Sequence, residues 1–133
     1  MRKVALFLVF ISTLTACQTE IYYTRSVVND TDYDIDLILM NSDPDQVADT
    51  IRLDANSTTI LRDFHQIDRP KEGLSCAPER TRIEIQVAGF EAILRTDFFN
   101  EDNWEKYLIG NRSMEQDCIF QIDNDNLLLY NPS

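Results

Sequence analysis

The most constraining feature of this sequence is a series of short β-rich runs, separated by clusters of Asn, Asp and Pro. In the clearest run, residues 81–87, the order is Thr-Arg-Ile-Glu-Ile-Gln-Val, so apolar and polar residues alternate. A period of two places the apolar residues on one face of a strand and the polar residues on the other. The runs recur at intervals of about 8 to 12 residues, which is typical of a sandwich or barrel.

The pattern predicts strands at residues 21–28, 33–40, 47–53, 57–62, 81–87, 90–95, 118–122 and 127–130. We interpret residues 63–80 as the longest irregular stretch, because it contains Pro70, Gly73 and Pro78. Within residues 97–110, large apolar residues recur at helical spacings, which predicts one short helix capped by Asn100 or Asp102 and closed by Gly110.

These elements favour an all-β fold. We expect one antiparallel β-sandwich domain at residues 21–133, of immunoglobulin-like or Greek-key type, with seven to eight strands and at most one short helix. No segment supplies the crossover helices that a parallel sheet needs. The 133 residues hold 23 acidic and 12 basic side chains, a net charge of −11. The length excludes a second domain of ordinary size, and the acidic balance excludes a phosphate-neutralising surface for nucleic acid.

The N-terminus differs from the rest of the chain. Arg2 and Lys3 precede an unbroken apolar run at residues 4–11, which is shorter than the roughly 20 residues of a membrane-spanning helix. It suits the apolar region of a signal peptide. The block ends in Leu-Thr-Ala-Cys at residues 14–17, which resembles the lipobox of bacterial lipoproteins. An ordinary secretory signal with a chance cysteine, or a buried apolar segment, are the alternatives.

The lipobox resemblance implies that residues 1–16 are removed and that Cys17 becomes an acylated N-terminus, palmitate being a typical acyl chain. Residues 17–20 then form a short tether between the lipid and the domain. Removal of residues 1–16 leaves 10 basic against 23 acidic side chains, a charge of −13. Gln18 stands where Asp resembles an inner-membrane retention signal, so we expect a lipid-anchored protein of the outer membrane, on its periplasmic face or at the cell surface.

Apart from Cys17, the chain contains Cys76 and Cys118. An exported protein enters an oxidising compartment, so we expect these two to form a disulfide. The alternative is two separate buried thiols. No C-x-x-C spacing indicates a redox-active pair.

The overall pattern resembles small lipoproteins of Bacteroidetes-type bacteria. A lipobox is followed by an Asn-containing turn, Val-Val-Asn-Asp-Thr at residues 27–31, by a hydrophobic strand, and by a second half compatible with a disulfide. The resemblance implies an exported β domain and carries no activity. Asp49-Thr50-Ile51 also resembles the short O-glycosylation motif of Bacteroides-type organisms.

Candidate chemistry is sparse. His65 is the only histidine, and a Ser-His-Asp site using Asp63 or Asp68 lacks a nucleophile context such as G-x-S-x-G. We expect no cofactor and no metal, since one His and two oxidised cysteines cannot form a zinc site. Alternating acids at residues 30–36 do not match an EF-hand, although calcium at this edge, or at Asp123 and Asp125, is an alternative. Five bases at residues 62–82 are mixed with acids and indicate a salt-bridged loop rather than an anion site.

One aromatic group offers a ligand or partner surface: Phe98, Phe99, Trp104 and Tyr107. Packing of most of these rings into one end of the core is the interpretation that we favour. We expect a non-enzymatic interaction or accessory module with a protein partner in the envelope. The alternatives are an enzyme inhibitor that projects a loop at residues 63–80, or a small hydrolase built around His65 or a carboxylate pair.

Overall fold

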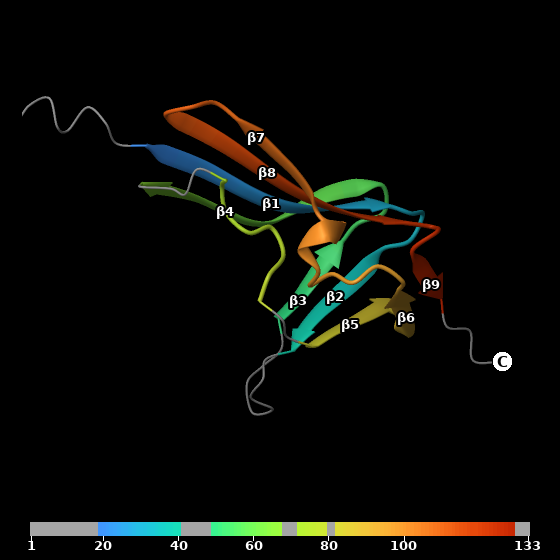
Figure 1. Cartoon of the computed structure of the whole chain (residues 1–133). Coiled ribbons are helices and arrows are strands. Elements are labelled where there is room, and N and C mark those ends of the chain that lie inside the picture. Colours follow the sequence, from blue (N-terminus) through green and yellow to red (C-terminus); the bar gives the residue numbers. More distant parts are fainter. Residues whose placement is uncertain (1–18, 41–48, 68–71, 80–81, 130–133) are drawn as a thin grey trace, which may run out of the picture.

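The computed structural model describes residues 19–40, 49–67, 72–79 and 82–129, which form two packed β-sheets (Figure 1). The four-stranded sheet, here the long sheet, has the order β4 (Ser57–Ile67), β1 (Glu20–Asp30), β8 (Ser113–Asp123) and β7 (Glu105–Ile109). The five-stranded sheet, here the short sheet, has the order β3 (Asp49–Leu53), β2 (Ile35–Met40), β5 (Arg82–Val87), β6 (Phe90–Leu94) and β9 (Leu127–Leu129). The predicted all-β sandwich is confirmed. In the described residues no helix is long and apolar enough to cross a bilayer.

One strand pair is parallel. β1 pairs with β8 in parallel over its whole length, from Glu20 opposite Ser113 to Asp30 opposite Asp123, whereas every other pair is antiparallel. No crossover helix is required, because the chain between these strands passes through the other strands of both sheets. The sequence pattern did not indicate this pair.

The long sheet reaches well beyond the short sheet (Figure 1). We call the projecting part the sheet extension, and it comprises residues 20–25 of β1, 62–67 of β4, 107–109 of β7 and 113–117 of β8. A register shift between Arg25 and Ser26 lies where the extension begins. Beyond this shift, Val27 and Phe120 of the long sheet enter the common core with Ile35, Leu37 and Leu53 of the short sheet.

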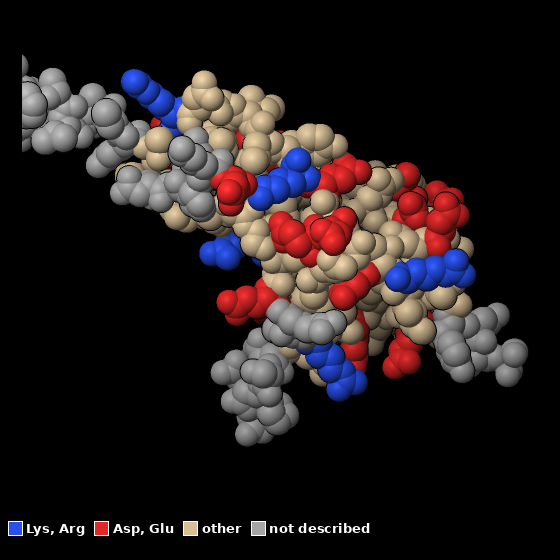
Figure 2. All heavy atoms as spheres, in the orientation of Figure 1, with Lys and Arg blue, Asp and Glu red and all other residues tan. Residues whose placement is uncertain are grey.

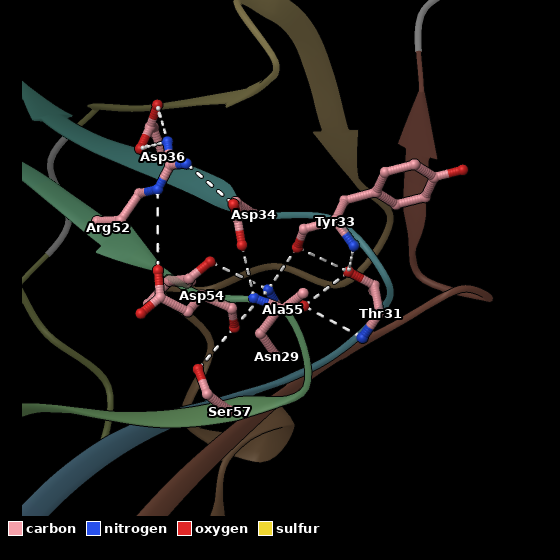
Figure 3. A network of polar contacts seen from close by, with 10 residues as sticks. Asn29, Thr31, Tyr33, Asp34, Asp36, Arg52, Asp54, Ala55 and Ser57 are labelled. Carbon is pink, nitrogen blue, oxygen red and sulfur yellow. Dashed lines mark hydrogen bonds and ion pairs between the residues drawn. The ribbon is translucent and has the colours of Figure 1, made fainter.

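The turn after β1 is held by a buried asparagine, Asn29 (Figure 3). Its side-chain amide donates to the carbonyl oxygens of Tyr33, Leu53 and Asp54 at 2.8, 3.2 and 3.1 Å. Its side-chain oxygen accepts from the backbone amide and the hydroxyl of Thr31. One side chain therefore satisfies backbone groups of two turns at the end of the sandwich.

The longest difference from the predicted strands is in β4. We expected residues 63–80 to be irregular, but β4 continues to Ile67, because residues 62–67 pair with residues 20–25 of β1. Residues 72–79 pack against the inner face of the sheet extension instead of projecting. The described part of the loop named in the inhibitor hypothesis is thus held against the sheet, and residues 68–71 and 80–81 lie outside the described residues.

The predicted helix at residues 97–110 is wrong. Only Glu101–Asn103 form a helical turn, the 3-10 turn η2, and the chain then enters β7. Asn100 does cap it, by accepting a hydrogen bond from the amide of Asp102 at 3.0 Å. Pairing with β8 satisfies the backbone of residues 105–109 and overrides the helical spacing of the apolar residues. Gly110, with a φ of 100°, turns the chain between β7 and β8. The described residues thus contain nine strands, more than predicted.

Candidate functional site

The predicted disulfide is present and fixes residues 72–79 to the long sheet. Cys76 is bonded to Cys118 of β8, with a Cα–Cα distance of 5.3 Å, and both are fully buried. Beside it, Gln116 accepts from the amide of Leu74 and donates to its carbonyl, both at 2.7 Å. The Tyr23 hydroxyl donates to the carbonyl of Ser75 at 2.9 Å. Cys17, the predicted lipidation site, lies outside the described residues.

Glu101 holds the same segment from the other side. Its carboxylate accepts from the backbone amides of Cys76 and Ala77, at 2.7 and 2.8 Å, and from the Ser75 hydroxyl at 2.8 Å. Burial raises the pKa of Glu101, but these three hydrogen bonds outweigh burial and the pKa is lowered overall. Glu101 is thus an ionised structural clamp.

The four aromatic residues do not form one exposed platform. Phe98 and Trp104 are only 2% and 6% exposed, and their rings contact each other and Phe120 at centroid distances of 5.1 to 5.3 Å. Phe99 packs edge-on against Phe98 and is partly buried. Tyr107 is exposed on β7, where it donates to Glu105. The favoured interpretation, core packing of most of these rings, is therefore confirmed, and the alternative of a shared ligand surface is not formed.

His65 lies on the outer face of the sheet extension. Its ring stacks on that of Tyr22 at 4.5 Å, and its Nε2 lies 2.9 Å from the carboxylate of Glu20. Asp63, one candidate partner for a catalytic His65, lies opposite Thr24 of β1. Asp68, the other candidate, lies outside the described residues. The described neighbours of His65 thus form a surface pair rather than a Ser-His-Asp arrangement.

Within the acidic edge at residues 30–36, Asp34 and Asp36 share one arginine partner (Figure 3). The Arg52 guanidinium lies 3.1 Å from the carboxylates of both Asp34 and Asp36. A hydrogen bond from the amide of Ala55, helped by Arg52, lowers the pKa of Asp34. At the second proposed calcium site, Asp123 accepts from the amides of Asp125 and Asn126. Within the described residues, no group of three or more candidate ligands could hold a metal.

Two arginines line a hollow between the sheet extension and residues 72–79. Arg25 and Arg62 are register partners, and the hollow of about 630 Å³ also includes Glu101. Arg25 lies over the rings of Tyr23 and Trp104, at 5.6 and 5.9 Å. Among the described residues neither arginine has a carboxylate within ion-pair distance. The described residues therefore do not show the predicted salt-bridged loop, because Arg82 contacts only Glu84 of its own strand, at 3.7 Å, and the other three bases lie outside the described residues.

A second opening lies in the short sheet, where β5 and β6 diverge. Their pairing runs only from Val87 opposite Phe90 to Ile85 opposite Ala92. Residues 82–84 of β5 and 93–94 of β6 continue without facing each other, and a pocket of about 510 Å³ occupies this region. Phe98 of the core contributes to its wall. The pocket combines apolar walls with strand backbone that has no partner on this side among the described residues.

The neighbouring edge of the short sheet exposes apolar side chains. Ile93 of β6 is 56% exposed and lies opposite Leu128 of β9, which is also exposed. Leu129 follows on the same strand and is exposed as well. We call Ile93, Leu128 and Leu129 the edge patch. β9 is the last strand of its sheet, so its outer backbone edge has no partner in the part of the chain described.

The edge patch was missed by the sequence reasoning, although a signal was present. Residues 127–129 are three consecutive leucines, and a strand with one solvated face should alternate instead. The role of Glu101 had no such signal, because the groups that donate hydrogen bonds to its carboxylate come from residues about 25 positions earlier in the chain. The glycosylation candidate Thr50 is exposed on β3.

Comparisons with protein-family models, with curated proteins and with solved structures give no match to this chain.

Proposed function

We propose that this protein is a lipid-anchored interaction module of the bacterial cell envelope, held at the outer membrane by an acylated Cys17 and acting on a protein partner without catalysis of its own. The observation that carries the proposal is the location of the edge patch and its pocket. They lie at the opposite end of the domain from the start of β1, which is where the anchor is joined (Figure 1). A lipid-anchored binder needs its binding surface away from its anchor.

The chemistry of this surface suits an extended apolar segment of an envelope protein. An added strand finds unpaired backbone along β9, or between residues 82–84 and 93–94. Apolar side chains of that segment then contact the edge patch or enter the pocket beside Phe98. Main-chain pairing supplies affinity, and the pocket of about 510 Å³ supplies selection by side-chain size.

The anchor itself is supported by the basic start, the apolar run and the small residues before Cys17. Several acyl chains, at about 0.8 kcal/mol for each buried methylene, hold a protein stably at a bilayer. A domain of charge −13 is repelled by anionic headgroups, so the lipid rather than the protein surface must supply attachment. Mass spectrometry of the mature N-terminus tests this part, and an unmodified Cys17 contradicts it.

A photo-crosslinking amino acid at position 93 tests the binding surface in intact cells. We expect one discrete adduct at Ile93 and its loss when Leu128 is replaced by Glu. The matched control is position 60, because Ile60 is 61% exposed on β4 of the other sheet. Equal crosslinking from both positions, or no adduct from position 93, contradicts a partner at the edge patch.

A further inference from the structure

The structure places an end of the domain that exposes large apolar side chains next to the predicted anchor. Glu20 begins β1, and it lies between Ile67 of β4 and Ser113 of β8. Its backbone amide donates to the carbonyl of Arg112 at 2.9 Å. The end of the sheet extension is therefore formed by Glu20, Ile67 and the turn between β7 and β8. We call these the anchor end.

The chain length between the anchor and this end is short. Glu20 is three positions after Cys17, which limits the distance between their Cα atoms to about 10 Å even when the chain is fully extended. A lipid on Cys17 thus holds the anchor end within about one headgroup layer of the bilayer, whatever the conformation of the tether.

The side chains at this end suit that position. Ile109, the last residue of β7, is 66% exposed, and Ile67, the last residue of β4, is 50% exposed. Tyr22 and Tyr107 are exposed two and four residue positions further in, counted from Glu20 along the register of the sheet. Tyrosine has an apolar ring and a polar tip, and it is enriched at membrane interfaces.

Charge distinguishes the same end from the rest of the domain. Glu20 and Glu115, which lies opposite Ile109, face Arg112 in this part of the sheet, and Glu20 also contacts His65 at 2.9 Å. The acidic side chains visible in Figure 2 lie mostly over the rest of the molecule, whereas the end at which β1 begins shows few of them. This end can approach anionic headgroups at a lower electrostatic cost than other parts of a domain of charge −13.

We propose that the anchor end is a second membrane contact, in which Ile109 and Ile67 enter the headgroup region of the bilayer beside the acyl chains. This inference rests on the proposed function, because it requires the lipid on Cys17. The lipid supplies attachment, and the side chains supply orientation. The sheet extension then projects from the membrane. The edge patch, on β6 and β9 of the short sheet, lies at the end of the domain away from the bilayer, where it can meet a partner.

Depth-dependent quenching tests this contact in the acylated protein, reconstituted in vesicles of phosphatidylethanolamine and phosphatidylglycerol. A fluorophore is attached to cysteine in the variant Ile109→Cys, and a lipid-borne nitroxide is the quencher. The matched control is Ile93→Cys, because Ile93 is similarly exposed but lies in the edge patch. We expect at least about twofold stronger quenching at position 109, and weaker quenching there after Ile67→Ser, with the melting temperature recorded for each variant.

The possible results are distinct. Equal quenching at positions 109 and 93 overturns the contact while leaving the anchor intact. A label at position 109 that is shielded from a water-soluble quencher but not quenched by the lipid-borne one contradicts the membrane contact, because protein then covers this end. If that shielding increases with the density of the protein on the vesicles, the covering protein is a second copy. Mass spectrometry of Cys17 separates the two proposals, because an unacylated Cys17 contradicts both, whereas an acylated protein without quenching contradicts the membrane contact alone.

Discussion

The side-chain amide of Asn29 donates a hydrogen bond to the carbonyl of Leu53 at 3.2 Å, which joins the end of β1 in the long sheet to the end of β3 in the short sheet. Both residues are fully buried. The two sheets are thus tied at one end by a polar contact within an otherwise apolar core. At a separate place, the disulfide joins residues 72–79 to β8 of the long sheet, and Glu101 binds the backbone of the same segment.

The first prediction concerns this amide. Asn29→Asp replaces a donor that faces three carbonyl oxygens with an acceptor, so we expect a loss of about 2 to 4 kcal/mol in the free energy of unfolding. Urea denaturation measures the loss. Asn29→Ala is the comparator, since it removes the bonds without adding repulsion, and it should cost less. An Asp variant as stable as the natural protein contradicts the assigned role of the amide.

The strands were predictable where one local pattern decides them. Alternation at residues 81–87 marked β5 because one of its faces is buried and the other solvated. The second half of β4 was not predictable, because residues 63–67 are held by pairing with β1, about 40 positions away. The helix predicted after Asn100 failed for the same reason, since β8 supplies the backbone partners of β7.

The site was less predictable than the fold. The presence of two cysteines beyond Cys17 predicted the bond between Cys76 and Cys118, which the structure contains. The burial of Phe98 and Trp104 followed the favoured interpretation, because large aromatic side chains usually fill cores. The edge patch depends on β9 being the last strand of its sheet, and no local pattern reveals strand order.

A second prediction concerns the turn between β5 and β6. Ala88 and Gly89 have φ angles of 52° and 80°, both in the left-handed region, as in a type I′ turn. Alanine is strained there, whereas asparagine tolerates this conformation. We expect Ala88→Asn to stabilise the protein by about 0.5 to 1 kcal/mol in thermal unfolding.

Gly89→Ala is the matched control for this turn. No atom lies within 4 Å of the added methyl group, so its effect reports the backbone alone. We expect a loss of about 1 kcal/mol. If the two substitutions change stability in the same direction, the turn does not have the conformation described.

The third prediction is a pH dependence that originates at Glu101. The pKa of Glu101 in the folded protein lies below the ordinary value of 4.5. Ionisation of this carboxyl group therefore stabilises the folded state relative to the unfolded state. This stability is present above pH 4.5 and is lost as the pH falls through the lower, folded-state pKa. Glu101→Gln should cost about 1 kcal/mol at neutral pH, a value kept small because solvent screens this exposed group.

The difference between the two proteins should therefore shrink as the pH falls below 4.5. Urea denaturation at a series of pH values measures it. Asp102→Asn provides a control on the same turn. It also removes one negative charge, but the hydrogen bonds to residues 75–77 described above are made by Glu101 and not by Asp102. A difference that stays constant down to strongly acidic pH would assign the effect of Glu101→Gln to shape rather than charge.

The last prediction concerns the disulfide. Cys76 and Cys118 are separated by 42 positions, and closing a loop of that length stabilises a protein by about 4 kcal/mol in the chain-entropy model. Both cysteines are fully buried, and two hydrogen bonds from the Gln116 side chain to the backbone of Leu74 hold the segment that carries Cys76. A thiol reductant cannot reach the bond unless the segment or the whole domain opens.

In a chain that begins at Gln18, which lacks Cys17, we expect no reactive thiol under native conditions and two after reductant is added in denaturing urea. Gln116→Ala should speed native-state reduction without changing the rate in urea, because it removes both hydrogen bonds to Leu74 and leaves the bond itself intact. Rapid reduction of the natural protein under native conditions would mean that residues 72–79 do not stay packed on the sheet extension, and that Glu101 and Gln116 do not hold them there.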